Sequence, residues 1–402
     1  MNLTRRARGL WPVLLILLFY LYGLASFPLI GSDEPRYAQV AREMWMRSDL
    51  VTATLGGRLW FEKPALPYWL AMAGYELFGV HEWSARLSSA ICGLLATFAL
   101  YILGRKIDRL SYNTPSANQS PGMFNNSGVV FALVFASSAG AIAFSRGVNF
   151  DIAVTMAITL GLVSFFISDI EETKRWRNLW LTGFYASLGL GLLAKGLVGV
   201  VLPGAIVLFY FVLRGSWPSK QFLISLLWGG PLTLLVASLW YGPVIYQHGW
   251  FFIDQFFIQH HFARYISNKY HHPQPFYFYP PVIALMVFPW TAFLIVGLYH
   301  CTKWNWRSTA PRDRLRVLAF AWLLFPIAFF TFSVSKLPGY ILPALPAAAI
   351  LAADVLTAGF QTRQFLQVIK TTGIILLIAG ASCFVYLWHF EQLSILLALI
   401  VA

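Results

Sequence analysis

Residues 10–37 decide the fold, and they read LWPVLLILLFYLYGLASFPLIGSDEPRY. Residues 10–30 are almost wholly apolar and long enough to cross a bilayer core of roughly 30 Å as a helix. A cluster of arginines precedes this run, and two carboxylates, Asp33 and Glu34, follow it directly. A signal peptide has a shorter apolar core, so we interpret residues 10–30 as an uncleaved first span.

The composition of the whole chain agrees with this interpretation. The chain has 402 residues, of which 58% are hydrophobic and 11% are charged. A typical soluble domain has about 25% charged residues, so this chain has too little charge to cover a water-exposed surface. The net charge of +13 follows the ends of apolar runs. Such placement indicates membrane topology, and we expect no nucleic-acid binding.

We predict an all-α, polytopic transmembrane helical bundle with about twelve spans, each close to the length that crosses a bilayer. The segment Pro64–Gly79 is also apolar but too short to span, so we place it as an interfacial or re-entrant helix. The candidate spans are 10–30, 86–104, 128–145, 150–168, 178–194, 196–213, 221–245, 279–299, 317–333, 340–357, 371–389 and 392–402.

The distribution of basic residues orients the bundle. With the N-terminus in the cytoplasm, most of the 29 Lys and Arg residues fall on cytoplasmic loops, as the positive-inside rule requires. Two long loops, 31–85 and 246–278, then face outward and are rich in aromatic residues. Long ordered loops are usually functional. We therefore predict one transmembrane domain over 1–402, with these two loops forming the active-site face.

The first outer loop is predicted to open with an amphipathic helix. Pro35 suits a first helical position, and apolar side chains from Tyr37 to Trp45 recur at helical spacing. Asp33 and Glu34 stand at the start of this helix. Two carboxylates there can act as a general base or hold a cation, whereas one alone suffices to cap the helix. The residue pattern leaves both interpretations open.

Three other charged positions can carry chemistry on the same face. Glu62-Lys63 lies between aromatic residues, where the lysine can bind phosphate or simply anchor the chain at the interface. Asp151 follows a short outer turn and can pair with Arg146. Lys195 lies between two apolar segments without a partner nearby in the sequence, which favours an anionic ligand because unpaired charge is unfavourable there.

The second outer loop adds histidines and an arginine. His260 lies near several other histidines, but their spacing matches no zinc motif, so the metal signal is weak. Arg264 can grip a phosphate with two hydrogen bonds. Lys336 and Tyr340 connect two late spans on the same side, where Tyr340 can close a pocket or merely mark the interface. The basic excess among these residues predicts an anionic headgroup, namely phosphate on a lipid-linked substrate.

Three motifs give the chain a resemblance to a known family. They are Gly31-Ser32-Asp33-Glu34-Pro35-Arg36-Tyr37-Ala38, the stretch 61–69 (FEKPALPYW) and the stretch 336–343 (KLPGYILP). In this order they resemble the polyprenyl-phosphate aminoarabinose transferases that modify lipid A. Those enzymes are C-type glycosyltransferases, related to the protein O-mannosyltransferases. The resemblance runs from the first span to about residue 357.

This resemblance implies an enzyme that moves a sugar from a polyprenyl monophosphate to an acceptor, with inversion at the anomeric carbon. Asp33 matches the catalytic acidic position and Asp151 a second acidic residue near it. Glu62 and His260 match positions that can hold a divalent cation, which the resemblance admits without requiring. The residues matching the substrate cavity are Arg36, Tyr37, Lys63, Lys195, Arg264 and Tyr340, and Lys336 joins them by its position on the same face.

The expected place is the bacterial inner membrane, with the site facing the periplasm and membrane lipids around the bundle. Lipid A is the leading acceptor, and a protein or another envelope glycan is the alternative. A transporter or flippase for anionic lipids is a second alternative from another class. Such transporters place charges at the midplane in broken, repeated helices. The lipid A enzymes also carry a soluble domain after their last span, which this sequence lacks; the chain is then either a shorter relative or a truncated one, and the acceptor depends on which.

Overall fold

A computed structural model describes residues 14–112, 126–262, 274–357 and 363–389. Across these residues the chain is helical almost throughout, which confirms the all-α class. The strands within them are β1 (Thr54–Leu55) and β2 (Arg58–Leu59), which pair antiparallel as a small hairpin.

Five of the described helices are long and apolar enough to cross a membrane, and up to seven when each of two bent helix pairs counts as one span. The five include α4 (Glu82–Tyr112), α7 (Asp151–Ile170) and α10 (Lys220–Ile253). The others are α14 (Pro311–Thr331) and the segment formed by η3 (Pro338–Ala344) and α15 (Leu345–Thr357). Two further helices, α8 (Lys174–Lys195) and α9 (Val198–Arg214), also fall where spans were predicted.

Two predicted spans are sharply bent. α5 (Ser127–Ala136) and α6 (Ala139–Ser145) meet at 64°, and α12 (Tyr279–Met286) is bent by 120° from the helical segment that begins with α13 (Thr291–His300) and runs on through η2 (Cys301–Lys303). The second break contains Pro289, which has no N–H and disfavours a helical residue before it.

The two breaks contact each other directly. The Ala139 N–H donates to the Phe288 carbonyl at 2.8 Å, and the Trp290 indole donates to Ser137 Oγ at 2.9 Å. Polar backbone groups freed by a break need partners where water is absent. Each break thus supplies partners to the other.

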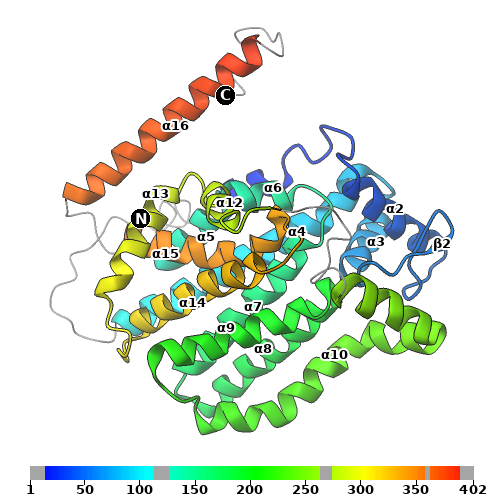
Figure 1. The fold of residues 1–402 in the computed structure, drawn as a ribbon, viewed down its shortest axis with the longest axis horizontal. Coiled ribbons are helices and arrows are strands. Elements are labelled where there is room, and N and C mark those ends of the chain that lie inside the picture. Colours follow the sequence, from blue (N-terminus) through cyan, green and yellow to red (C-terminus); the bar gives the residue numbers. More distant parts are fainter. Residues whose placement is uncertain (1–13, 113–125, 263–273, 358–362, 390–402) are drawn as a thin grey trace, which may run out of the picture.

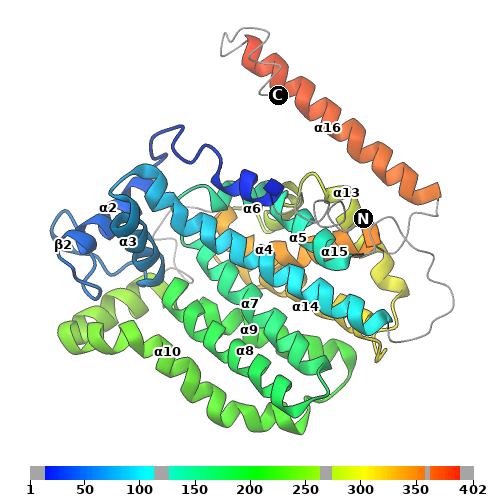
Figure 2. The ribbon, with the colours of Figure 1, turned by 180° about the vertical axis from the view of Figure 1, so that it is seen from behind.

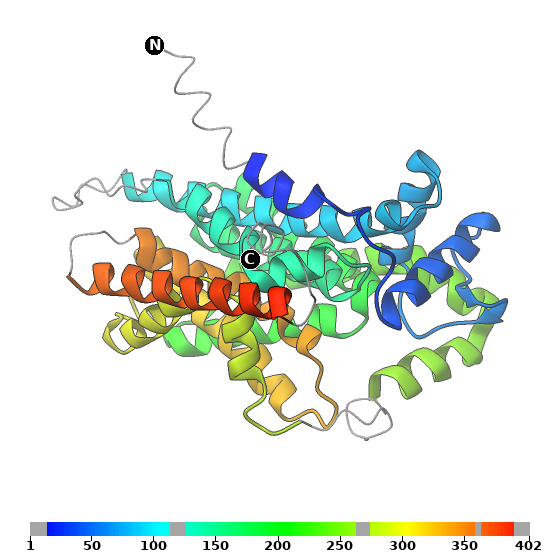
Figure 3. The same ribbon diagram turned by 90° about the horizontal axis from the view of Figure 1, so that it is seen from above.

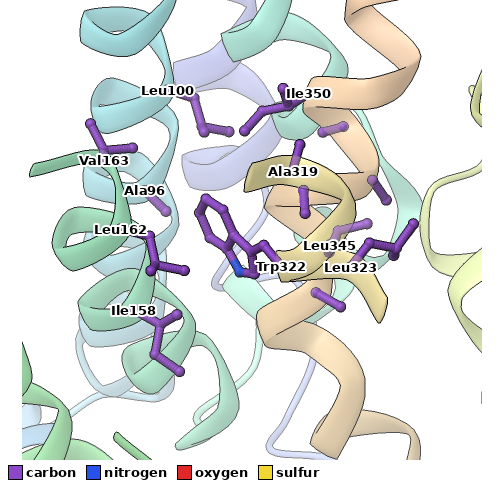
Figure 4. Close-up of a cluster of buried hydrophobic side chains, with 14 of the residues drawn as sticks. Ala96, Leu100, Ile158, Leu162, Val163, Ala319, Trp322, Leu323, Leu345 and Ile350 are labelled. Atoms are coloured by element: carbon purple, nitrogen blue, oxygen red, sulfur yellow. The ribbon is translucent and has the colours of Figure 1, made fainter. Parts of the chain in front are cut away.

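The core lies between α4, α7, α14 and α15, where Figure 4 shows side chains from these helices converging on Trp322. Trp322 is fully buried, and its indole donates to the Pro343 carbonyl at 2.7 Å. Ala96 and Ala319 leave room for the large ring. Replacing such a tryptophan with alanine typically costs about 3–5 kcal/mol.

The first outer loop forms a compact layer at one end of the bundle. It contains the predicted amphipathic helix, α2 (Asp33–Met46), then the β-hairpin and α3 (Leu66–Phe78). The 13 residues of α3 are too few to span a bilayer. Figures 1 and 2 show this layer beside the far end of α10, and the Trp240 indole of α10 donates to the Val51 carbonyl at 2.9 Å.

The second predicted outer loop is partly helical. α10 continues past residue 245 to Ile253, and η1 (Asp254–Phe262) follows it. Gly249, at φ 52°, marks a kink inside α10 that an L side chain would strain. The apolar run Trp250–Ile253 continues the helix beyond that kink. At the other end of the chain, α16 (Arg363–His389) lies outside the main bundle (Figure 1); from above it runs in front of the bundle (Figure 3), and it contacts α13.

Candidate active site

The first part of the site is built from two helix ends. Asp151 begins α7 and Lys195 ends α8. Because these neighbouring helices run antiparallel and pack along their length, the two residues meet, and Lys195 Nζ donates to Asp151 Oδ1. Each charge also has the sign that its helix terminus favours. Their side chains are 16% and 22% exposed, so the ion pair stays accessible at the protein surface.

Asn149 caps the start of α7, which leaves the Asp151 carboxylate available for the ion pair with Lys195. The Asn149 side chain accepts the Ile152 N–H at 3.1 Å and so caps the first turn of α7. The Asp151 carboxylate therefore does not have to cap the helix itself. The sequence analysis inferred an anionic ligand for Lys195 because no partner lies near it in the sequence. The structure corrects that reason, since Lys195 has a carboxylate partner 44 residues away in the chain. The alternative Arg146–Asp151 pair does not form, and Arg146 instead donates to the Phe19 carbonyl at 3.0 Å.

Residues of η3 close over this ion pair. The Lys195 ammonium lies 4.9 Å from the centre of the Tyr340 ring, a cation–π arrangement. Gly339 leaves the space that the pair needs, because a Cβ there would lie 2.2 Å from Asp151 Oδ2. Tyr279 of α12 lies within electrostatic reach of Asp151 and Tyr340, and its buried hydroxyl lies near the Leu337 backbone without a hydrogen bond of regular geometry to any described residue.

A second charged cluster lies in the outer layer. Arg36 Nη1 lies 3.3 Å from Asp33 Oδ1 and 3.9 Å from Glu62 Oε2, while Lys63 Nζ lies 3.2 Å from Glu62 Oε1. The structure thus brings together four residues that the sequence predicted separately. Asp33 is the most exposed of them, at 62%, whereas the Glu62 and Lys63 side chains are mostly buried.

Glu34 has a different environment from its neighbour Asp33. Its carboxylate receives two hydrogen bonds from the fully buried Arg86, at 2.8 and 3.0 Å, and two more from the backbone N–H groups of Ile30 and Val148. Burial acts to raise the pKa of Glu34, but the Arg86 and backbone hydrogen bonds outweigh it and hold the pKa below its ordinary value. Glu34 therefore fixes the outer layer onto the bundle.

A cavity of about 480 Å³ opens beside Asp33. It lies between residues 27–30, the start of α2 that follows them, and the turn from α6 to α7. Asp33 contributes an exposed carboxylate to it and Arg146 a guanidinium. The remaining lining residues are Phe27, Ile30, Glu34, Ile142, Ala143, Gly147, Val148 and Asn149.

Aromatic rings join the two charged clusters. Phe150, next to Asp151, lies 4.7 Å from the Tyr37 ring and 5.1 Å from the Tyr68 ring. The Tyr68 hydroxyl and the Trp60 indole N–H are buried and lie near each other, but neither makes a hydrogen bond of regular geometry in the described part of the chain. Burial acts first to raise the pKa of Tyr68, whose electrostatic neighbours include Arg36 and Glu62.

The sequence analysis missed these two polar groups. Tyr68 and Trp60 lie in or beside a quoted motif, but an aromatic residue near an apolar helix has the ordinary appearance of an interface residue. Unpartnered buried polar atoms need a reason. Their position beside charged side chains makes them candidates for contact with a ligand.

Three predicted site residues remain: Lys336 lies just before η3, and His260 and Arg264 are described only in part or not at all. Lys336 is buried, and its ammonium donates to the Gln274 carbonyl at 3.1 Å. Arg264 lies outside the described residues, and of His260 only the backbone, within η1, is described. The Glu62 carboxylate lies close to two cations, and no group of three or more His, Cys, Asp or Glu side chains gathers within the described ranges. The His260 side chain lies outside what the structure describes, so a cation held between Glu62 and His260 stays a prediction.

Comparison with known proteins gives consistent matches. A family model described as dolichyl-phosphate-mannose-protein mannosyltransferase matches residues 62–114. An undecaprenyl phosphate-alpha-4-amino-4-deoxy-L-arabinose arabinosyl transferase of Pseudomonas paraeruginosa is 30% identical over 393 residues, covering 94% of this chain and 66% of that protein. The protein of the same name from Pseudomonas savastanoi pv. phaseolicola is 30% identical over 397 residues, covering 96% and 69%.

The fold is similar to that of a solved relative. The crystal structure of ArnT from Cupriavidus metallidurans bound to undecaprenyl phosphate matches with a TM-score of 0.81 and 25% identity, covering 96% of this chain and 66% of that one. The chain therefore spans about two thirds of the length of these relatives.

Proposed function

Because the chain belongs to the undecaprenyl phosphate-4-amino-4-deoxy-L-arabinose arabinosyl transferase family, we propose that it transfers a sugar from a polyprenyl monophosphate to lipid A. The donor follows from the relatives' names and from the undecaprenyl phosphate in the solved relative. The acceptor follows from the resemblance of the three motifs to the lipid A enzymes. Basic and aromatic side chains around Asp151 and Glu62 support an anionic lipid-linked donor.

The chain is a helical membrane glycosyltransferase of the bacterial inner membrane. We further propose that all twelve predicted segments cross the membrane, each bent pair crossing once. Basic residues in the last turns of α4 and α9 and in the first turns of α14 support a cytoplasmic location for those helix ends. The outer layer and the second loop then face the periplasm and form the active-site face.

We assign the donor phosphate to the basic groups. Lys63 and Lys195 supply point charges, Arg36 and Arg264 supply guanidinium groups, and Lys336 joins them from the η3 side. Tyr340 covers the Lys195 ammonium and closes that side of the donor site. Cations stabilise the charge that develops as phosphate leaves, and they act strongly where water is excluded. Asp151 positions Lys195 through their ion pair.

We assign the acceptor to Asp33, whose carboxylate faces both the cavity and Arg36. In the proposed step, an acceptor oxygen attacks the anomeric carbon from the side opposite the phosphate. The new carbon–oxygen bond forms as the bond to the phosphate oxygen breaks, and the phosphate keeps the electron pair. Asp33 orients the acceptor and takes its proton when the attacking group is a hydroxyl. The anomeric configuration is inverted.

The observation that carries this proposal is the exposed Asp33 carboxylate at the mouth of a cavity, next to Arg36 and the Glu62–Lys63 pair. The test supplies purified protein with polyprenyl-phosphate aminoarabinose and lipid A, and measures modified lipid A by mass spectrometry. We expect Asp33→Asn to lower turnover at least a hundredfold, the lower end of general acid–base contributions. Glu82→Gln, an exposed carboxylate at the start of α4, is the matched control and should retain activity.

The same assay separates the alternatives. Full activity of Asp33→Asn would show that Asp33 has no catalytic role. Transfer to a protein or another glycan, with lipid A unmodified, would show that lipid A is not the acceptor. Movement of labelled lipid across vesicles without any transfer would favour the transporter.

A further inference from the structure

A second cavity lies at the end of the bundle away from Asp151. It has a volume of about 560 Å³ and is bounded by α4 on one side, α8 on the other and the end of α7 beneath. α7 packs against both other helices, and Figure 2 shows it between them. The lining residues are Tyr101, Ile102, Arg105, Lys106, Arg109, Ile167, Glu171, Trp176 and Trp180.

The cavity and the candidate active site lie near opposite ends of α7. α7 begins with Asp151 and reaches Ile167, at the floor of the cavity, near its last turn. At 1.5 Å per residue these positions are roughly 25 Å apart, close to the thickness of a bilayer core. The cavity therefore does not belong to the site described above, and its basic rim places it on the cytoplasmic side.

The wall formed by α4 is apolar along most of its length and basic at one end, which matches the acyl chains and the anionic headgroup of a lipid. Ile91, Leu95, Phe98 and Ile102 lie along one stripe of the helix, spaced by four, three and four residues. The first three are 38%, 41% and 57% exposed, so this stripe has no protein covering it in the described structure. The same spacing continues to Arg105 and Arg109. An apolar face thus passes directly into two positive charges at the level of the headgroups.

The charges in this cavity are only partly compensated. Lys106 Nζ lies 2.6 Å from Glu171, which neutralises that lysine. Arg105 and Arg109 form no ion pair with any described residue. The aliphatic carbons of Arg105 cross Gly128 of α5, where a Cβ would lie 2.7 Å from Arg105 Cγ. This close packing holds the stem of Arg105 against α5, and the residue lines the cavity.

Tryptophans complete the opposite wall. Trp176 and Trp180 are one helical turn apart on α8, and Trp176 is 53% exposed. Tryptophan side chains favour the depth of lipid headgroups, where an apolar ring and an N–H can both be satisfied. Their presence favours a membrane lipid over a free ion as the ligand.

We propose that this cavity binds an anionic diacyl phospholipid of the cytoplasmic leaflet. Arg105 and Arg109 bind its phosphate, Trp176 and Trp180 flank the headgroup, and an acyl chain lies along Ile91, Leu95 and Phe98. Basic pockets between transmembrane helices on this side of a membrane are suited to anionic headgroups. The site is separate from the sugar donor, and its occupancy does not depend on the transferase reaction.

Native mass spectrometry of the full chain released from detergent tests this proposal. The protein is mixed with equal amounts of phosphatidylglycerol, which is anionic, and phosphatidylethanolamine, which is neutral overall. We expect a clear preference for phosphatidylglycerol in the native sequence. The double variant Arg105→Gln/Arg109→Gln should lose this preference by about tenfold to thirtyfold, the effect expected when two headgroup contacts are removed.

Two further variants make the result specific. Lys174→Gln/Arg175→Gln removes the same charge from exposed positions just outside the cavity and should leave the preference unchanged. Arg105→Lys/Arg109→Lys keeps the charge and should retain most of the preference, which shows that the fold tolerates substitution. Equal losses in both Gln double variants would overturn the proposal, as would displacement of phosphatidylglycerol by millimolar inorganic phosphate.

Discussion

Lys195 at the end of α8 donates a hydrogen bond to Asp151 at the start of α7, so one ion pair joins two antiparallel helices at the candidate active site. We predict that Lys195→Ala raises the KM for the polyprenyl-phosphate donor by more than tenfold, because a phosphate ligand is lost. Lys195→Arg keeps the charge and should retain part of the activity. Steady-state kinetics over a range of donor concentrations checks this expectation, and an unchanged KM for Lys195→Ala would contradict it.

Gly339 provides an independent test of the same ion pair. A methyl group at this position would lie 2.2 Å from Asp151 Oδ2, so Gly339→Ala must displace the carboxylate or the backbone of η3. We expect turnover to fall at least tenfold while the protein still folds. Gly204→Ala on α9 is the matched control, since nothing lies within 4 Å of a Cβ there. Equal activity of the two variants would show that the placement of Asp151 is not critical.

The Glu34–Arg86 pair makes a prediction about stability. Arg86→Leu leaves a buried carboxylate without its main partner, which typically costs about 3–5 kcal/mol. The double variant Glu34→Leu/Arg86→Leu removes both charges and should recover part of this loss. Thermal unfolding in detergent measures both effects. A double variant that is less stable than Arg86→Leu alone would argue against this account.

The protonation state of Glu43 controls how firmly the β-hairpin is attached to α2. Burial acts to raise its pKa, but hydrogen bonds from Thr54 and Gln39 and from the Gly56 and Gly57 backbone outweigh it and lower the pKa from 4.5 to about 2. The ionised Glu43 carboxylate therefore stabilises the folded state. This contribution is complete above pH 4.5 and is lost as the pH falls toward 2. We therefore expect the β-hairpin to detach from α2 in that interval.

Hydrogen exchange of residues 47–59 between pH 5 and 2.5, corrected for intrinsic exchange rates, measures this detachment. Glu43→Gln removes the titrating group, so its protection should be low throughout and independent of pH. Equal pH dependence in the two proteins would show that another group is responsible.

Tyr68 separates ligand binding from stability. Its buried hydroxyl makes no hydrogen bond of regular geometry with a described residue and at most a weak contact with the Trp60 indole, so Tyr68→Phe removes little from the free protein. We expect the unfolding temperature to stay the same or rise, while the KM for the donor increases several-fold. A loss of stability with an unchanged KM would instead place the hydroxyl in a structural role.

Local features of this protein were predictable from the sequence. The spacing of Tyr37, Val40, Ala41 and Met44 predicted one buried face of α2, and these four side chains are buried in the structure. Helix formation depends on periodicity within a short segment, which a sequence displays directly. The same applies to α3, which the sequence predicted as a short helix outside the set of spans.

Pairing between distant residues was not predictable. Lys195 and Asp151 are 44 residues apart, and Glu34 and Arg86 are 52 residues apart. Which charges meet depends on how helices pack in three dimensions, and no pattern within either segment records it. The sequence analysis therefore found the right residues for the Asp151–Lys195 pair but assigned Lys195 to a ligand alone.

The hydrogen bonds between the two helix breaks have a consequence for synthesis of the protein. The Ala139 N–H and Ser137 Oγ are bonded to residues that leave the ribosome much later, Phe288 and Trp290. Until then the Ala139 N–H at the bend between α5 and α6 lacks this partner, whereas the Ser137 hydroxyl already donates to the Leu133 carbonyl. We therefore expect this break to be fully stable in lipid only after α12 and α13 have been inserted beside it.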